Sequence, residues 1–223
     1  MAALILILNL VNTIGETIFD ITMLEEAKKT IEGYASMSED AQKAAIKTFV
    51  GPFRANFFFW ANLVGAVTQI FLVSRIFKYL GVRVALFSLP VIGLIAYGGV
   101  SIFPVLAYVR IAKIAENATD YSLYNTVKQA LWLPTSREDK YNAKMTIDSF
   151  IVRSGDLVAA GLVLLLLKKM DIGAQGLAVA NVVMVVVWLT IVFFIGRENA
   201  KRTEMMEKKK QAHAPASKAA APA

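Results

Sequence analysis

Six stretches of mostly apolar residues, separated by short polar segments, divide the chain. Each stretch is about long enough for a helix to cross the hydrocarbon core of a bilayer. They cover residues 2–23, 53–80, 84–103, 104–133, 141–167 and 176–195. The last is the clearest, because its 20 residues include no charged side chain. The pattern predicts an all-α integral membrane protein with six transmembrane helices.

Two polar regions lie outside these stretches. Residues 24–52 carry nearly balanced acids and bases, and they are predicted to form an extracytoplasmic linker. Within that linker Ser38 has the residue type and position of an N-cap, which predicts the start of a short surface helix. Residues 197–223 are basic and then rich in Ala, Pro and Lys, a composition that predicts a disordered tail.

The distribution of basic residues predicts the orientation in the membrane. Residues 75–83 contain three bases and no acid, and residues 197–210 contain six bases against three acids. The positive-inside rule places both segments in the cytoplasm, and six spans then put both termini there. The linker and the turns near residues 103 and 170 would lie outside, although Lys168 and Lys169 oppose this assignment.

The beginning of the chain is apolar from residue 2. No basic residue precedes the apolar run and no small-residue cleavage site follows it, so the segment does not read as a signal peptide. A spanning helix would usually be preceded by flanking residues. We therefore expect this sequence to be a piece of a longer protein, cut just before a helix.

The fourth stretch, residues 104–133, combines helical continuity with charge. It contains no proline or glycine between Pro104 and Pro134, so nothing interrupts a helix there. On a regular helical wheel its polar side chains fall within an arc of roughly 80°. These are Arg110, Lys113, Asn117, Asp120, Tyr124 and Lys128. Because a charge at the bilayer centre costs about 3 kcal/mol or more, this stripe must face a partner helix or a wet cavity.

The stripe admits two interpretations. In the first it holds helices together through ion pairs, with Asp120 meeting Arg153 or Lys144, and Glu16 meeting Lys113. In the second some of its charges bind an anionic substrate along a transport path. Arginine and lysine suit phosphate, since arginine binds it bidentately and lysine supplies a compact charge.

Two further polar groups are candidates for function. Asn12, Glu16 and Asp20 recur every four residues in the first stretch and share one helix face. A buried acid there could relay protons or form an ion pair with a cationic partner, or it could make a polar contact between helices. Near the expected cytoplasmic end of the fifth stretch, a gate or ion-pair anchor is expected from Asp148, Arg153 and Asp156.

The composition agrees with a membrane protein and excludes several functions. Hydrophobic residues make up 57% and charged residues 18%, below the roughly 25% of soluble domains. There is no cysteine, and the one histidine, His213, lies in the polar tail. The sequence has no P-loop, no G-x-S-x-G motif and no metal-ligand spacing. We therefore expect no enzyme, cofactor, metal or nucleic acid, and we attribute the net charge of +7 to cytoplasmic segments.

Residues 116–156 contain the pieces TDYS, QALWLP and KYNAK, and the first stretch contains NTIGE. In these pieces the chain resembles the bacterial and plastid nucleotide transporter family, the ATP/ADP translocases, whose fold resembles that of the major facilitators. The close match covers about 40 residues, and the hydrophobic layout agrees over the rest.

The resemblance implies that the chain is the C-terminal six-helix half of a twelve-helix carrier in a bacterial inner membrane. It implies exchange of nucleotides, or of other phosphorylated metabolites, by alternating access. The partner would be the missing N-terminal half or a second copy. Glu16 would correspond to the family's acidic residue in its seventh span, and substrate binding is expected at Arg110, Lys113, Asn117, Asp120, Lys128 and Glu16.

Two other functions remain open. A permease subunit of an ATP-driven importer carries a cytoplasmic motif of the form EAA-x3-G-x9-I-x-LP. Residues 116–134 imitate it without the glycine and with the spacing one residue short. A membrane scaffold without transport activity is the third possibility, and it predicts that the charged stripe tolerates neutral substitution.

Overall fold

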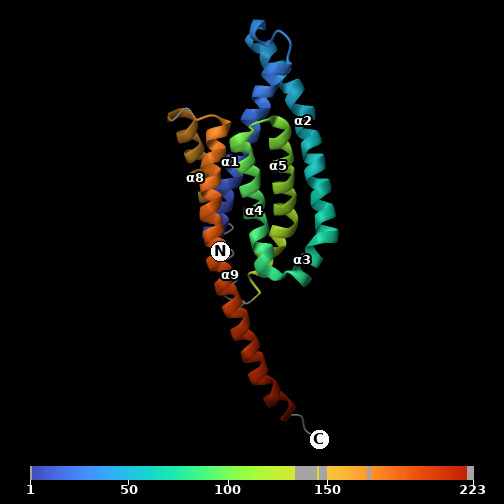
Figure 1. Ribbon diagram of the computed structural model, residues 1–223, viewed down its shortest axis with the longest axis vertical. Helices are drawn as coiled ribbons and strands as arrows, with labels where there is room; N and C mark the ends of the chain where they lie inside the picture. Colours follow the sequence, from blue (N-terminus) through green and yellow to red (C-terminus); the bar gives the residue numbers. More distant parts are fainter. Residues whose placement is uncertain (1, 134–144, 146–149, 170–171, 220–223) are drawn as a thin grey trace.

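The protein is a bundle of helices (Figure 1). The computed structural model describes residues 2–133, 145, 150–169 and 172–219. Its longer helices are α1 (Ala2–Thr30), α2 (Glu39–Val67), α4 (Gly81–Ile102), α5 (Leu106–Thr119), α8 (Val152–Leu164) and α9 (Ala174–Ala219). The shorter ones are α3 (Val73–Tyr79), α6 (Asn125–Ala130) and the 3-10 turn η1 (Tyr34–Ser36). Three π-helical turns complete the described elements: η2 (Thr68–Leu72), η3 (Asp120–Tyr124) and η5 (Leu165–Lys169).

Four helical segments of the described chain are long and apolar enough to cross a membrane. They are Ala2–Thr30, Glu39–Tyr79, Gly81–Ile102 and Ala174–Met206. Large apolar side chains cover the outer face of the α2–η2 segment, including Phe59 of α2 and Ile70 and Phe71 of η2. An all-helical bundle with such surfaces fits the integral membrane protein that the hydrophobic pattern predicts.

The other two expected spans have a different character. Residues 106–130 follow one helical path through α5, η3 and α6, but they carry four charges between Arg110 and Asp120. The expected span at 141–167 falls partly outside the described residues, and α8 begins at Val152. The tight turn expected at Pro104 is present, because α4 ends at Ile102 and α5 begins at Leu106.

Helix α1 lies at the centre of the bundle. It packs against α2, α5, α8 and α9. Its buried residues recur every three or four positions, and Leu4, Val11, Ile14 and Ile18 have no exposed surface. This is the spacing of a helix that buries a broad apolar face. Helix α1 therefore contributes most of its apolar face to the core of the bundle.

The expected linker at 24–52 is mostly helical. Only residues 31–38 lie outside α1 and α2, and they form the turn that joins the two helices. Gly33 supplies its left-handed residue, with φ of 64°. Ser38 is an N-cap as the sequence predicts, since its side chain accepts a hydrogen bond from the Ala41 amide at 3.4 Å. The helix that it begins is 29 residues long and not a short surface helix.

The C-terminal segment also differs from the sequence prediction. Disorder is expected from residue 197, whereas α9 continues to Ala219 and projects well beyond the bundle (Figure 1). Ion pairs spaced by four residues support this extension: Arg202 with Glu198 at 2.9 Å and Lys208 with Glu204 at 2.8 Å. Such pairs each stabilise an exposed helix by a few tenths of a kcal/mol.

The π-helical turn η3 changes the phase of the polar stripe. A π turn adds one residue to the helical repeat, so the residues that follow it are rotated relative to a regular wheel. Tyr124, expected on the stripe, is fully buried and packs edge-on against Trp188 of α9, with the ring centroids 5.7 Å apart. The indole Nε1 donates a hydrogen bond to the Tyr124 hydroxyl at 3.3 Å.

Gly15 allows α1 to approach α4 and α5 closely. A Cβ at this position would lie 2.0 Å from the Tyr97 hydroxyl oxygen and 3.2 Å from the Lys113 Nζ. Both groups are buried, so neither can withdraw freely. Glycine is therefore required here by packing, and not by its backbone conformation.

We expect Gly15→Ala to lower the apparent melting temperature of the detergent-solubilised protein, because the methyl group overlaps buried polar atoms. Overpacking of this kind costs about 1–3 kcal/mol. Gly98→Ala in α4 is the control, since its Cβ would meet nothing within 4 Å. A thermal shift of the same size and direction in both variants would contradict the packing role of Gly15.

Candidate functional site

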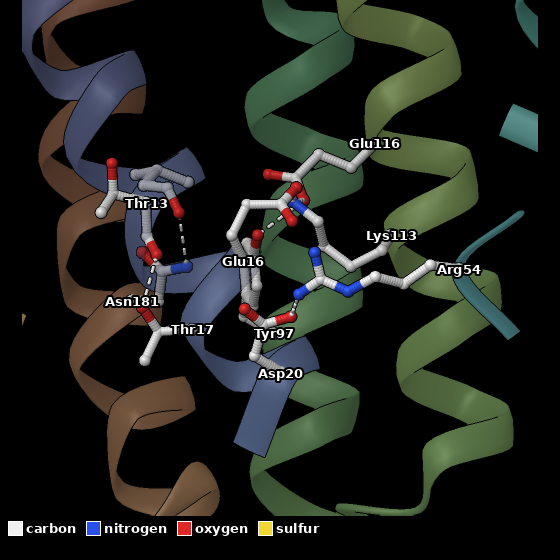
Figure 2. Close-up of polar contacts among 10 residues, drawn as sticks. Thr13, Glu16, Thr17, Asp20, Arg54, Tyr97, Lys113, Glu116 and Asn181 are labelled. Atoms are coloured by element: carbon white, nitrogen blue, oxygen red, sulfur yellow. Dashed lines mark hydrogen bonds and ion pairs between the residues drawn. The ribbon is translucent and has the colours of Figure 1, made fainter. Parts of the chain in front are cut away.

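A buried lysine is the centre of the candidate site. Lys113 of α5 is 2% exposed, and its ammonium lies 2.8 Å from Glu116 Oε2 and 3.2 Å from Glu16 Oε1 (Figure 2). Glu116 comes from the next turn of α5, while Glu16 comes from α1. The ion pair between Glu16 and Lys113 that the sequence predicts is therefore present.

The two carboxylates stand in different environments. The Glu116 side chain is 1% exposed, whereas that of Glu16 is 48% exposed. Tyr97 of α4 donates a hydrogen bond to Glu116 Oε2 at 2.6 Å, so this oxygen accepts from two donors. The second Glu116 oxygen, Oε1, is buried and has no hydrogen-bond partner among the described residues. Glu116 is thus fixed inside the protein, and Glu16 stands at its surface.

A second ion pair lies one turn farther along α1. Asp20 pairs with Arg54 of α2, and Figure 2 shows this pair beside Glu16 and Lys113. The partners are each nearly half exposed. Together with Glu116, these groups place three carboxylates and two cations between α1, α2 and α5.

Arg110 adds a further cation about one turn before Lys113. Its guanidinium donates to the Asn56 side-chain oxygen of α2 and lies 5.2 Å from the ring centroid of Phe53. Among the described residues it forms no ion pair with a carboxylate. With Arg110 included, the three cations balance the three carboxylates, so the formal charge of the cluster is zero. The partners of the Arg110 guanidinium are a neutral amide and an aromatic ring.

The other residues of the polar stripe, Asn117, Asp120 and Lys128, differ in their burial and partners. Asn117 is 7% exposed and lies within the bundle. Asp120 pairs with Lys128 at 3.6 Å, and not with the expected Arg153. The other expected partner, Lys144, lies outside the described residues. The Lys128 ammonium also lies 5.6 Å from the centroid of the Tyr124 ring. The pair lies within one helical segment that contains the π turn, and Asp120 Oδ1, which is buried, has no hydrogen-bond partner among the described residues.

The gate candidates are only partly described. Asp148 and Lys144 lie outside the described residues. Arg153 and Asp156 of α8 are exposed, and neither has an ion-pair partner within the described part of the chain. Their side chains do not join the site around Lys113.

Sequence reasoning missed four contributors to this region: Tyr97, Arg54, Asn181 and the inward position of Glu116. Asn181 is fully buried and donates to the Val11 carbonyl at 3.1 Å, which ties α9 to α1 beside the site (Figure 2). Of these residues, Asn181 is the one that the sequence could have indicated, because an amide in an otherwise apolar span needs a hydrogen-bond partner on another helix. Nothing in the local sequence of Tyr97 or Arg54 indicates a partner on another helix.

The arrangement is chemically suited to binding an anion. The described residues contain no group of three or more His, Cys, Asp or Glu side chains placed to hold a metal. They do present two cations, Lys113 and Arg110, near a half-exposed carboxylate that an incoming anion could replace.

Three curated proteins show similarity at low identity. The chain is 25% identical over 186 residues to ADP,ATP carrier protein 1 of Chlamydia trachomatis, covering 70% of this chain and 35% of the relative. It is 24% identical over 200 residues to ADP,ATP carrier protein 1 of Chlamydia muridarum, covering 77% and 37%. The match to ADP,ATP carrier protein 2 of Chlamydia pneumoniae covers 93 residues at 27% identity.

No family model matches the chain, and no solved structure matches it. The chain spans 35% and 37% of the lengths of the first two relatives, so the comparison concerns one part of those carriers. The low-identity similarity to proteins named as ADP,ATP carriers supports the resemblance to nucleotide transporters that the sequence motifs indicate.

Proposed function

We propose that this chain is part of a membrane carrier that exchanges nucleotides such as ATP and ADP, or other phosphorylated metabolites. The observation that carries the proposal is Lys113, an ammonium buried among apolar helices and held by carboxylates from α1 and α5. Ionisable groups are expensive inside a membrane bundle and commonly mark transport paths. The low-identity similarity to ADP,ATP carriers supports nucleotides as the substrate class.

The two carboxylates on Lys113 have separate roles in this proposal. Glu116 is an internal anchor, because it is buried and also held by Tyr97. Glu16 is a displaceable counter-ion, because its side chain is half exposed and its contact with Lys113 is longer. A substrate phosphate would replace Glu16 on Lys113 and take Arg110 as a second contact. The Asn117 amide and the Asp120–Lys128 pair would complete the path along the same helical segment.

The proposed architecture is one six-helix bundle of a twelve-helix carrier, and resembles half of a major facilitator. The four apolar spans would be completed by the α5–α6 segment and by α8. The partner bundle would be a missing N-terminal half or a second copy, consistent with the chain's 35% coverage of its relative. Transport would proceed by rocking of the two bundles around a central site. The termini would be cytoplasmic, with Asp148, Arg153 and Asp156 as a gate or anchor near that side.

The importer alternative meets an obstacle in the structure. In an importer this motif has to be exposed to a separate ATPase subunit. Glu116, the first residue of the stretch that resembles the motif, is 1% exposed and is ion-paired with the buried Lys113. Copurification of an ATPase subunit with the chain would favour the importer. Tolerance of neutral substitutions at Lys113 and Arg110 would favour the scaffold.

Proteoliposomes containing the full-length protein, with its partner bundle where there is one, should exchange internal ADP for external labelled ATP. The assay is uptake of label into ADP-loaded vesicles compared with empty vesicles. Stimulation by internal nucleotide is the expected result. Absence of uptake for every nucleotide and phosphorylated metabolite tested would refute the carrier proposal.

Lys113→Gln should lower the melting temperature, because it leaves Glu116 buried without its cation. The protein that still folds should exchange far less than the parent, because the cation that would meet the phosphate is gone. Loss of a charge-assisted contact corresponds to about tenfold or more in affinity. Lys43→Gln is the matched control, since Lys43 forms an exposed surface pair with Glu39. Equal losses of exchange and of folded yield in Lys113→Gln would point to a purely structural ion pair.

The anchor and the displaceable counter-ion should respond differently to neutralisation. Glu116→Gln is expected to lower the apparent melting temperature, because it breaks a buried charge pair, a change that costs several kcal/mol. Glu16→Gln should leave the melting temperature nearly unchanged while altering exchange, because its side chain is half exposed. The reverse order of thermal effects would show that the roles are assigned incorrectly.

A further inference from the structure

A polar cleft opens on the side of the bundle where α2 meets the segment after α5. It has a volume of about 350 Å³ and lies between the α2–η2 and η3–α6 segments. Small residues, including Gly65, line one part of it. Its polar lining consists of Asn62, Gln69, Tyr121, Ser122, Asn125 and Thr126. None of its lining residues belongs to the charged cluster around Lys113.

The amides of this cleft need an explanation. Asn62, Gln69 and Asn125 are all exposed, although α2 is otherwise covered with apolar side chains at this level. Polar groups at membrane depth are costly unless they meet protein, water or a ligand. Seven residues separate Asn62 from Gln69, so both lie on one face of the helix and reach the same cleft.

The side chains that line the cleft are unsuited to a phosphate group and suited to a heterocyclic base. The lining has no charged residue, so it offers nothing to hold a phosphate. Asparagine and glutamine can pair bidentately with the edge of a heterocyclic base through one donor and one acceptor. Tyr121 is 61% exposed at the cleft and offers an aromatic face on which a planar ring can stack.

The cleft continues the surface that carries Arg110. Helices α2 and α5 pack along their lengths, with a Cβ at Gly65 reaching only ordinary contact with Ala118 at 3.6 Å. Asn56, which accepts from Arg110, precedes Asn62 by six residues, or about 9 Å along α2. A cation and an uncharged amide cleft thus follow one another on the same seam between the two helices.

Two π-helical turns meet at this cleft. Gln69 belongs to η2, and Tyr121 and Ser122 belong to η3; the two turns pack against each other. Turns of this kind are often found at functional sites, because they open the regular ladder and redirect side chains. Both π turns lie at the polar cleft. This backbone feature favours a ligand site there and does not depend on which residue types line the cleft.

We propose that this cleft is the subsite for the heterocyclic base of a nucleotide, whose phosphates are held by Arg110 and Lys113. The inference rests on the proposed carrier function and deepens it, because it separates base recognition from phosphate recognition. Asn62, Gln69 and Asn125 meet the edge of the base, and Tyr121 stacks on its face. A carrier of phosphorylated metabolites without a base would leave the cleft unused.

Binding of ATP and of inorganic tripolyphosphate to the full-length protein in nanodiscs tests the proposal. Asn125→Leu and Tyr121→Ala should each weaken ATP binding about tenfold, since a stacked base contributes about 1–3 kcal/mol. The same variants should leave tripolyphosphate binding unchanged. Gln129→Leu removes an exposed amide of the same helical segment outside the cleft, so it should bind ATP like the parent. Tyr121→Phe keeps the ring and should recover most of the ATP affinity that Tyr121→Ala loses.

Each other outcome has a distinct meaning. If ATP binds no more tightly than tripolyphosphate to the parent protein, the base subsite is refuted while the phosphate site stands. If the cleft variants leave ATP binding unchanged, or weaken ATP and tripolyphosphate equally, the cleft is a contact between helices of two bundles and the base proposal fails. If the parent binds neither compound, the base subsite and the phosphate site at Arg110 and Lys113 are both refuted for nucleotides.

Discussion

The burial of one ammonium group organises the interior of this bundle. Lys113 has almost no exposed surface, and a charge in that position is tolerable only with anionic partners at hydrogen-bonding distance. Glu116 and Glu16 supply them, at 2.8 and 3.2 Å. The close approach of α1 to α4 and α5 at Gly15 follows from this requirement, because a larger residue would occupy the space of Tyr97 and Lys113.

The polar groups of the protein separate into two kinds. Charged side chains gather where α1, α2 and α5 meet, and nearly all find an opposite charge there. Uncharged amides and hydroxyls gather in the cleft beside η2 and η3. Apolar side chains occupy the remaining outer surface of α2. The charged groups and the uncharged polar groups therefore occupy separate parts of the bundle.

Helix geometry explains why the sequence predicted part of the site. Spacing by four residues placed Glu16 and Asp20 on one face of α1, and both meet cations from neighbouring helices. Regular spacing failed beyond residue 119, because η3 rotates the positions that follow. Tyr124 consequently enters the core against Trp188, and Asp120 pairs with Lys128 of the same helical segment.

From the sequence by itself we predicted the helical class, four of the six apolar spans now found, the tight turn at Pro104 and, in one of two interpretations, the pairing of Glu16 with Lys113. These features follow from local composition and from the period of the helix. Only the tertiary structure decided that Glu116 turns inward to Tyr97, that Asn181 ties α9 to α1, and that the amides of α2 and α6 share one cleft. Each of these depends on which helices are neighbours, and contacts between helices far apart along the chain leave no periodic signal in it.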